Sequence, residues 1–283
     1  MSYFFPVSMA KLSGAGNTFV LVDARPGSQW VTEEPRIKIS RAEFAKRICN
    51  PVTGVSTDGV LFIEKGSDGF DFDWDFYNSD GSTAEMCGNA ARCAARFCYE
   101  RLSDKTQFKF KTGAGLVTAT LQDNGEVSVV MPQAQWIKKD IEILSMDGAK
   151  EKFSLVNTGV PHLVQKIKNL DQVSELLDMA REMRSHPTLA PSGANVTFYS
   201  EDKSGEIKAV TYERGVEDYT LACGTGAVAA AMVYADVTGL HDVKVAMPGG
   251  SMRVEFSKDD PHPLMTGPAL LISEFKINLE VLK

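Results

Sequence analysis

The sequence predicts an α/β fold made of two similar domains, and three observations lead to this prediction. Many short segments rich in Val, Phe, Ile and Thr are separated by Gly, Asn, Asp and Ser, which is the pattern of strands and turns. Helical segments are few. The third observation is an internal repeat, because MCGNAARCAA at residues 86–95 and LACGTGAVAAA at residues 221–231 both place a Cys-Gly pair ahead of an alanine-rich run.

Length and composition agree with a globular protein of this class. The chain has 283 residues, enough for two domains of ordinary size, and its 43% hydrophobic and 24% charged residues are typical of globular proteins. No apolar run reaches the roughly 18 residues of a membrane span. The start, MSYFFPVSMAKLSG, lacks the basic lead-in and the apolar core of a secretory signal. We therefore expect a soluble, cytoplasmic protein that does not bind membranes.

Charge and cysteine usage narrow the function classes. The net charge is -7 and no basic stripe with interleaved aromatic residues occurs, which excludes a nucleic-acid surface and favours work on small molecules. The five cysteines form an odd set without the density of a secreted disulfide scaffold, so we expect reduced thiols. They are Cys49, Cys87, Cys93, Cys98 and Cys223.

The elements follow one another as strands punctuated by a few helices. Helices are expected at 41–49, 88–102, 170–183 and 224–238. The third has apolar residues at helical spacing with charges between them, as in an outer amphipathic helix, whereas the second and fourth open with alanines and should be buried. Strands are expected at 19–23, 59–63, 73–78, 107–111, 115–121, 126–131, 154–157, 195–199, 206–213, 242–246, 253–256 and 269–274, with a hairpin turn at 248–250.

The repeat organises these elements into two halves. Cys87 and Cys223 are 136 positions apart, and the same offset aligns the strand end at Asn78 with the strand end at Arg214. Strand, polar loop, Cys-Gly and buried helix therefore occur twice. A unit of this length is too long for a solenoid repeat, so we expect two similar domains that face each other. The longest stretch poor in strand signals, residues 132–153, would separate them.

A cysteine at the start of a helix has a specific chemistry. The N–H groups there lack partners and carry partial positive charge, which lowers the thiol pKa from about 8.5 toward neutrality and can hold a carboxylate. Gly88 and Gly224 would let the anion approach the backbone. Two such sites could hold one carboxylate with a sulfur on either face of the adjacent carbon. One thiolate would remove a proton and the opposite thiol would deliver one, inverting the stereocentre without a cofactor.

Other motifs in the chain do not point to a metal or nucleotide site. Cys93 and Cys98 lie inside the second helix and are expected to pack, because their spacing from Cys87 does not suit a zinc site. GAGNTF at residues 14–19 lacks the third glycine of a dinucleotide fingerprint. No sign of pyridoxal phosphate, a metal or a nucleotide is seen, so no cofactor is predicted.

Six collinear motifs give the chain a family resemblance. GAGNTFVLVD (14–23), FYNSDGSTAEMCGNAARC (76–93), TGVPHLV (158–164), ANVTFY (194–199), YERGVEDYTLACGTGA (212–227) and MPGGSMRVEF (247–256) resemble the diaminopimelate epimerase family in order and spacing. The resemblance implies a cofactor-independent isomerase that interconverts LL- and meso-diaminopimelate on the lysine and peptidoglycan route. It implies two pseudosymmetric domains, each a mainly antiparallel barrel-like sheet around a central helix, with the active site in the cleft between them.

The resemblance also implies domain limits and site residues. The N-terminal domain would comprise residues 1–130 with the C-terminal strand 269–283, and the C-terminal domain residues 131–268. Cys87 and Cys223 would be the two acid/base thiols, with His162 and Glu213 tuning them. The backbone cradles for the reacting carboxylate would be Gly88, Asn89, Gly224 and Thr225, and the other substrate ligands Asn17, Asn78, Asn195, Glu213 and Arg214. The sequence leaves open whether the chain forms a homodimer.

Some positions depart from the family pattern. Val160 occupies a position where the family has an asparagine, Thr18 replaces a common aspartate, Tyr219 stands where an acidic residue is frequent, and the loop at residues 49–59 differs. The alternatives are a proline, hydroxyproline or other amino-acid racemase, an isomerase of the phenazine-biosynthesis type, a non-catalytic binding module and a thiol redox protein. The paired Cys-Gly sites disfavour the last three, and Asn78, Asn195 and Arg214 favour a substrate with a second amino-acid end.

Overall fold

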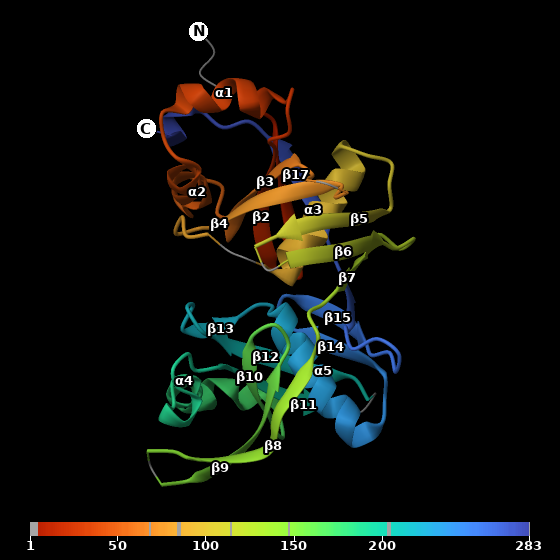
Figure 1. The fold of residues 1–283 in the computed structure, drawn as a ribbon. Coiled ribbons are helices and arrows are strands. Elements are labelled where there is room, and N and C mark those ends of the chain that lie inside the picture. The colour runs from red at the N-terminus through yellow and green to blue at the C-terminus, as the bar shows by residue number, and fades with distance from the viewer. Residues whose placement is uncertain are drawn as a thin grey trace. The chain divides into compact units, whose positions relative to one another are not determined.

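The computed structural model describes residues 5–67, 69–83, 86–113, 115–146, 148–202 and 205–282 (Figure 1). The chain divides into two compact units. Unit 1 comprises Met1–Val129 and Pro268–Lys283, and unit 2 comprises Val130–Gly267. Each unit has its own sheet and its own core, so each is described by itself.

Unit 1 is a curved sheet with one helix against its inner face. Its strands are β1 (Met9–Gly14), β2 (Asn17–Asp23), β3 (Gly59–Lys65), β4 (Phe72–Asn78), β5 (Gln107–Thr112), β6 (Gly115–Leu121), β7 (Val127–Val130) and β17 (Leu270–Phe275). Its helices are α1 (Gln29–Ile37), α2 (Arg41–Cys49) and α3 (Gly88–Arg101), with the 3-10 turn η3 (Leu279–Leu282) near the end of the chain.

The sheet of unit 1 runs in the order β17-β1-β2-β3-β4-β5-β6, and β7 pairs with β6. These pairs are antiparallel except for β2–β3 and β4–β5, which are parallel. Helix α3 packs against β1, β2, β3, β6 and β17, strands from both ends of this order. The sheet therefore wraps around α3, which explains why the alanine-rich face of this helix is buried.

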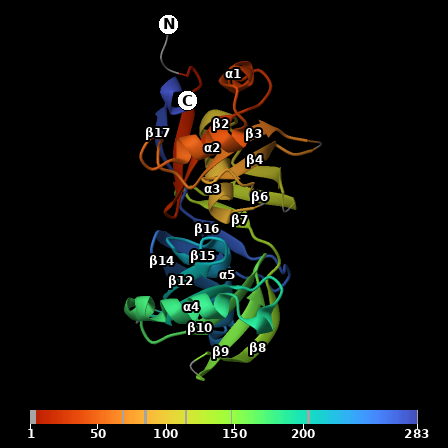
Figure 2. The ribbon, with the colours of Figure 1, turned by 90° about the vertical axis from the view of Figure 1, so that its left-hand side faces the viewer.

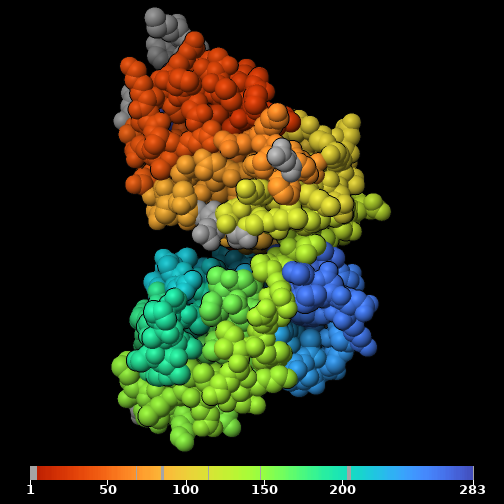
Figure 3. Space-filling view, in the orientation of Figure 1, coloured from red at the N-terminus to blue at the C-terminus, as the bar shows by residue number. Residues whose placement is uncertain are grey.

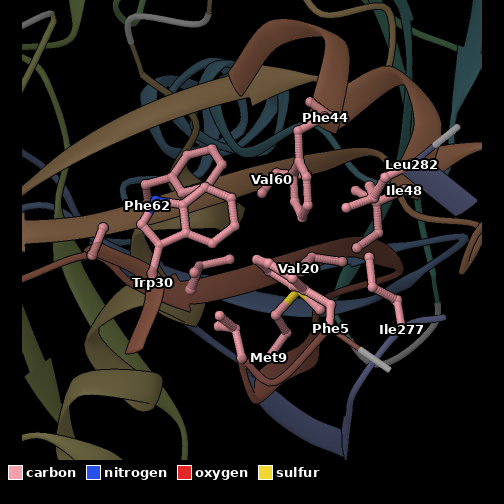
Figure 4. Close-up of a cluster of buried hydrophobic side chains, with 14 of the residues drawn as sticks. Phe5, Met9, Val20, Trp30, Phe44, Ile48, Val60, Phe62, Ile277 and Leu282 are labelled. Carbon is pink, nitrogen blue, oxygen red and sulfur yellow. The ribbon is translucent and has the colours of Figure 1, made fainter. Parts of the chain in front are cut away.

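A second core in unit 1 lies on the other face of the sheet. The side chains of Phe5, Trp30, Phe44 and Phe62 meet there, with ring centroids 5.0 Å apart for Trp30–Phe44 and 4.8 Å for Trp30–Phe62 (Figure 4). Rings that meet edge-on or tilted at such distances pack favourably. Ile277 and Leu282, from the end of the chain, belong to the same cluster, so the C-terminal segment is part of the core of unit 1.

Unit 2 contains β8 (Gln135–Leu144), β9 (Lys150–Asn157), β10 (Pro161–Lys166), β11 (Asn195–Glu201), β12 (Ile207–Glu213), β13 (Asp218–Thr220), β14 (Asp242–Met247), β15 (Gly250–Glu255) and β16 (Leu264–Gly267). Its helices are α4 (Leu177–Arg184) and α5 (Gly224–Thr238), with the 3-10 segments η1 (Leu170–Leu176) and η2 (Pro187–Leu189). Helix α5 lies among the strands in both ribbon views (Figures 1 and 2).

The sheet of unit 2 repeats the topology of unit 1. Its order is β8-β9-β10-β11-β12-β14-β15-β16, with β13 added beside the end of β12. The parallel pairs, β10–β11 and β12–β14, occupy the same places as β2–β3 and β4–β5. Helix α5 packs against β9, β10, β11, β12, β14 and β15, as α3 does in unit 1. The strand pairing confirms the internal repeat predicted from the sequence.

The amphipathic segment of unit 2 lies on its surface. Helix α4, seen from outside in the space-filling view (Figure 3), buries Ala180 and Met183 against the core. Only the second half of the helix predicted at 170–183 is α-helical, because the first half, η1, is a 3-10 segment that begins at the cap formed by Asn169. None of the residues of η1 is buried.

The prediction of a strand-poor stretch at residues 132–153 is wrong. Strand β8, the longest of the described strands, and the start of β9 lie there. The sequence WIKKDIEIL does not show the apolar pattern of a strand, because β8 is exposed along most of its length. It buries only Ile141 and Ile143. The elements at β1, α1, β10, β13 and β16 were also not predicted. Within the described residues, no helix is long and apolar enough to cross a membrane.

Candidate active site

Each unit places a cysteine at the start of its buried helix. Cys87 is the N-cap of α3 with extended backbone angles (φ -146°, ψ 120°), and Cys223 is the N-cap of α5 (φ -122°, ψ 108°). Each cysteine carbonyl accepts the first helical hydrogen bond, from Ala91 and Ala227 respectively, at 2.9 Å. The prediction that both cysteines begin helices is confirmed. The N–H groups of a first helical turn attract anions, so both thiols lie where a thiolate and a carboxylate are stabilised.

The two thiols differ in their exposure. Cys87 is partly exposed, whereas the Cys223 side chain is buried. The Gly226 N–H donates to Cys223 Sγ at 3.4 Å, so this sulfur caps its own helix. Gly226 is required for this geometry, because a Cβ there would lie 2.2 Å from Thr211 Oγ1 on β12.

In unit 1 the predicted ligands Asn17 and Asn89 are in direct contact. The Asn89 Nδ2 group donates to Asn17 Oδ1 at 2.6 Å, joining the start of β2 to the first turn of α3. Gly14, at the end of β1, lets the hairpin approach the helix, since a Cβ there would lie 2.7 Å from the Asn89 carbonyl oxygen. Asn17 is therefore held against Asn89, two residues after Cys87.

Asn78 lies at the same edge of the sheet of unit 1. It ends β4 opposite Gly59, and Gly59 lies opposite Phe19 on β2. Its Nδ2 donates to Ser82 Oγ at 3.0 Å, in the loop that leads toward Cys87. Gly88 is buried at the first helical position. Asn17 and Asn89 are thus joined at the first turn of α3, where Cys87 and Gly88 also lie, and Asn78 ends a strand of the same sheet.

In unit 2 Glu213 is a direct neighbour of the thiol. Its carboxylate has hydrogen bonds from Cys223 and from Thr220 Oγ1. Burial raises the pKa of Glu213 above its ordinary value, while these two hydrogen bonds act in the opposite direction. Glu213 is thus the carboxylate in direct contact with the Cys223 thiol.

His162 reaches the thiol through one hydroxyl group. Its Nε2 lies 3.0 Å from Thr225 Oγ1, which in turn lies 3.4 Å from Cys223 Sγ, and its Nδ1 lies 2.9 Å from Thr197 Oγ1. Burial lowers the pKa of His162 to about 3. The imidazole is therefore neutral at physiological pH, and one hydroxyl group separates it from the Cys223 thiol.

The orientation of Asn195 fixes the tautomer of His162. The Arg214 backbone N–H can only donate, and it bonds Asn195 Oδ1 at 2.9 Å. The Nδ2 group of Asn195 therefore faces His162 Nε2, at 3.3 Å, and this nitrogen must accept. The ring hydrogen is then on Nδ1, facing Thr197 Oγ1, and the single lone pair of Nε2 faces both Asn195 Nδ2 and Thr225 Oγ1.

Arg214 and Thr225 are the remaining predicted site residues with side chains in unit 2. The Arg214 side chain is exposed just after β12, where Nη1 donates to the Ser192 carbonyl oxygen at 3.1 Å. Thr225 follows Gly224, and its backbone carbonyl accepts from Thr158 Oγ1 at 2.9 Å. All seven predicted residues of unit 2 thus lie around the N-terminus of α5 or at the adjacent ends of β10, β11 and β12.

The departures from the family pattern have local partners. Thr18 donates through its N–H and Oγ1 to Asp58 Oδ2, at 2.7 and 3.2 Å, so the divergent loop supplies a carboxylate beside position 18. Tyr219 packs edge-on against Phe198 and Tyr212, and its hydroxyl donates to the Val173 carbonyl oxygen at 3.1 Å. Tyr219 therefore belongs to the core of unit 2. Nothing in the structure explains Val160.

Three polar residues around the site were missed from the sequence. Thr197 and Thr211 are buried on adjacent strands with their hydroxyl oxygens 3.0 Å apart, and Arg92 is buried in α3 with Nη2 2.7 Å from Asn89 Oδ1. The only available signal is a polar residue at a position where the strand or helix pattern demands an apolar one. A single residue of this kind is a weak signal, because many buried polar groups are structural.

The other cysteines are packing residues, as predicted for Cys93 and Cys98. Burial raises the pKa of Cys49 to about 11 and of Cys93 to about 12, and it also raises the pKa of Cys98. A buried thiol with a raised pKa is unreactive. Among the described residues, no group of three His, Cys, Asp or Glu side chains has the geometry of a metal site.

A cavity of about 190 Å³ lies elsewhere in unit 1, at the C-terminal end of α3. Cys98 and Leu102 line it together with Lys105 and Asp71, which form an ion pair. None of the predicted site residues borders this cavity, so the polar groups around the two helix N-termini remain the candidate active site.

Comparison with known proteins assigns the family. The family model described as diaminopimelate epimerase matches residues 9–137 and 154–272. The chain is 37% identical to the diaminopimelate epimerase of Aquifex aeolicus over 281 residues, covering 96% of this chain and 98% of the relative. It is 32% identical to the diaminopimelate epimerase of Methanocaldococcus jannaschii over 301 residues, covering 96% and 98%.

Solved structures of lower identity share the fold. A probable proline racemase from Agrobacterium radiobacter aligns with a TM-score of 0.67 and 17% identity over 96% of this chain and 92% of that chain. A phenazine biosynthesis protein of the PhzF family from Bacillus anthracis aligns with a TM-score of 0.70 and 16% identity over 96% and 98%. At such identities these structures show the two-domain α/β architecture alone. On the family model and the near full-length relatives, the chain belongs to the diaminopimelate epimerase family.

Proposed function

We propose that this protein interconverts LL-2,6-diaminopimelate and meso-diaminopimelate, as a cofactor-independent isomerase of lysine and peptidoglycan precursor biosynthesis. The observation that carries the proposal is the cysteine at the N-cap of the buried helix in each of two units with the same topology. In a chain of this family, a duplicated thiol site suits a reaction that needs one acid and one base. The small-molecule substrate and the thiols also suit a reducing, cytoplasmic setting.

The reaction is a proton exchange at one α-carbon. One thiolate takes the α-proton and becomes a thiol, while the opposite thiol gives its proton to the other face of the carbon and becomes a thiolate. No other bond breaks and no electrons leave the substrate. Cys87 and Cys223 fill these two roles and exchange them when the reaction runs in reverse. The carbanion is stabilised by the helix N-termini, whose N–H groups hold the adjacent carboxylate.

The cradles for that carboxylate are the first turns of α3 and α5. Gly88 and Gly224 occupy the first helical positions, and Asn89 and Thr225 follow them. Glycine presents its N–H without a side chain in the way. We assign the reacting carboxylate to these N–H groups, with Asn17 adding a side-chain donor in unit 1.

The distal end of the substrate carries a second amino and carboxylate group. Asn78, Asn195 and Arg214 provide donors and acceptors for it, at strand ends beside each helix. The exposed guanidinium of Arg214 suits a bidentate carboxylate contact. We propose that units 1 and 2, with domain limits at 1–130 plus 269–283 and at 131–268, each contribute half of one active site.

The thiol of unit 2 has proton-handling neighbours. Glu213 bonds it directly, and neutral His162 orients Thr225 beside it. We propose that Glu213 exchanges a proton with Cys223, whereas His162 holds the Thr225 hydroxyl in place. Both residues tune Cys223 by contact or through one intermediate group.

The test is a single-turnover isotope experiment. LL-diaminopimelate incubated with the protein in heavy water should gain one deuterium at an α-carbon as meso-diaminopimelate forms, measured by mass spectrometry and chiral chromatography. Cys87→Ala and Cys223→Ala should each lower kcat by at least about 10³-fold, because each removes an acid or base. The matched control is Cys93→Ala, which removes a buried packing thiol from α3 and should keep kcat while lowering the free energy of unfolding by about 1 kcal/mol.

Two outcomes contradict the proposal. Racemisation of proline or glutamate without turnover of diaminopimelate would replace the substrate. Full activity in either single cysteine variant would remove the two-thiol mechanism, because one remaining thiol cannot act on both faces of the carbon.

A further inference from the structure

Arg92 is a fully buried cation close to Cys87. It lies in the second turn of α3, its relative exposure is 0%, and alanines flank it along the helix. Burial lowers the pKa of its guanidinium from the ordinary value, while the neighbouring Cys93 and Cys87 act in the opposite direction. Taking a guanidinium out of water is costly unless its N–H groups are bonded. A guanidinium buried at this cost in free energy, close to Cys87, requires an explanation.

The bonds of Arg92 lead to a predicted substrate ligand. Its Nη2 donates to Asn89 Oδ1 at 2.7 Å, and its Nε donates to the Pro268 carbonyl oxygen at 3.2 Å. Asn89 then donates through Nδ2 to Asn17 Oδ1 at 2.6 Å. We call these three side chains, Arg92, Asn89 and Asn17, the amide chain.

The direction of the amide chain follows from the chemistry of its first member. A guanidinium has donors and no acceptor, so Asn89 must turn Oδ1 toward Arg92. Its Nδ2 group then faces Asn17, which must turn Oδ1 toward Asn89. The Nδ2 group of Asn17 is then the part of its amide that is not bonded to Asn89. A residue without donors at position 92 would remove this constraint on the direction of the two amides.

In unit 2 the direction of the Asn195 side-chain amide is also set by a group that can only donate, but different residues are involved. The residue at the repeat offset from Arg92 is Val228, and the residue equivalent to Asn89 is Thr225. There the donor-only group is the Arg214 backbone N–H, which sets Asn195, and Asn195 sets His162. Both units thus use an obligate donor to decide which atom a neighbouring polar side chain presents.

We propose that Arg92 is a positioning residue that fixes the direction of the amide chain, so that Asn17 presents an N–H donor to the carboxylate of the substrate. This inference rests on the proposed function for the identity of the carboxylate ligand. The orientation of the Asn17 amide can be measured without any substrate. A reversed Asn17 would present an oxygen to the carboxylate, which repels it.

The first experiment reads the amide directly. Protein labelled with ¹⁵N-asparagine is compared with Arg92→Met, which keeps an unbranched apolar side chain but removes the donors, and with Arg92→Lys, which remains donor-only. The side-chain Nδ2 signals of Asn17, assigned from their loss in Asn17→Ala, should move in Arg92→Met and stay near the wild-type position in Arg92→Lys. Arg92 does not bond Asn17 itself, so the change must pass through Asn89.

The second experiment is a mutant cycle on LL-diaminopimelate. Arg92→Met should raise KM about tenfold with a smaller change in kcat, the size expected for one hydrogen bond to a charged group. In the Asn17→Ala background the same substitution should change KM by less than about twofold, because the group through which it acts is gone. Asn89→Asp should also raise KM about tenfold, because a carboxylate at position 89 accepts from Arg92 and forces Asn17 to reverse.

The outcomes separate the two hypotheses. If the wild type does not turn over diaminopimelate, the proposed function fails, and the Asn17 signals still decide whether Arg92 sets the amide. Unmoved Asn17 signals in folded Arg92→Met overturn the inference, as does an effect of Arg92→Met on KM that is undiminished in the Asn17→Ala background. If Arg92→Met does not fold, the Asn17 side-chain signals in Asn89→Asp, which keeps the buried cation and its partner, carry the same test.

Discussion

At the scale of single residues, the buried His162 shows how environment decides a role. Its pKa is lowered to about 3 by burial, and the donors around Nε2 make that nitrogen an acceptor. A neutral imidazole with its hydrogen on Nδ1 cannot supply positive charge to a thiolate. It can hold the Thr225 hydroxyl in one orientation beside Cys223, and this is the role that the geometry supports.

The depressed pKa of His162 predicts a pH dependence of stability. An unfolded histidine binds a proton below about pH 6.5, whereas folded His162 stays neutral until about pH 3. The unfolded state therefore binds more protons in this window, and stability is lost as the pH falls through it. His162→Gln should reduce the slope by up to about 1.4 kcal/mol per pH unit between pH 6 and 4, measured by urea unfolding.

The matched control for this slope is His241→Gln. His241 is exposed, so the same substitution there reports the effect of exchanging histidine for glutamine outside the core. An unchanged slope in His162→Gln would show that the imidazole is protonated in the folded protein, and the assignment of its hydrogen to Nδ1 alone would be wrong.

The candidate site divides into residues that a sequence can and cannot reveal. Cys87 and Cys223 were predicted because the same four-part pattern occurs twice at one offset, and chance rarely repeats a helix start of this kind. Thr197, Thr211 and Arg92 were missed because each is one polar residue in an otherwise apolar pattern. Their role depends on which side chain lies across the sheet or along the helix, and this is visible only in three dimensions.

At the scale of elements, α5 approaches β12 so closely that the contact tolerates no larger side chain at position 226. Gly226 faces Thr211, and a Cβ at position 226 would lie 2.2 Å from Thr211 Oγ1 and 3.2 Å from Thr211 Cβ. The helix cannot approach the strand in this way with any other residue.

Gly226→Ala should therefore destabilise the protein although alanine is the better helix former. The overpacking should cost about 1–3 kcal/mol, measured by urea unfolding. Thr211→Ala removes the clashing oxygen, so the double variant should be more stable than the sum of the two single changes predicts. Additive single effects would show that the helix shifts freely and that the contact does not fix it.

Strands and helices were predicted where local pattern and tertiary position agree. The ranges of α2 and α5 were correct because their ends carry signals, with Ser40 capping α2 and Gly239 in the left-handed conformation after α5. Helix α1 was missed because it contains Pro35 and lacks a side-chain cap. Strand β8 was missed because an exposed strand needs few apolar residues, and its place in the sheet comes from pairing with β9.

At the scale of the whole molecule, the two ends of the chain meet in unit 1. Strand β17 pairs with β1, the Phe5 N–H donates to the Ile277 carbonyl oxygen at 2.8 Å, and Arg47 bonds the Leu282 carbonyl oxygen. In unit 2 the equivalent outer strand is β8, which immediately precedes β9 in the chain. Unit 2 is thus built from one continuous segment, and unit 1 from two.

Removal of the chain after Gly267 should therefore affect the units unequally. The truncated protein loses β17, Ile277 and Leu282, so amide protons of β1, β2 and α3 should exchange at least about tenfold faster, measured by hydrogen-exchange mass spectrometry. Amides of β11, β12 and α5 should keep their protection, because the core of unit 2 contains no residue from this segment. The control is Ile272→Thr, which changes an exposed side chain on β17. Equal loss of protection in both units would contradict the division.

The discontinuous make-up of unit 1 bears on how the protein is made. A ribosome delivers β1 to β7 first, but the strand that lies beside β1 leaves the exit tunnel last. Unit 2 is one continuous segment that leaves the tunnel before β17 does, and unit 1 has to wait with an open edge until β17 follows. The half that carries Cys87 is thus synthesised first and finished last.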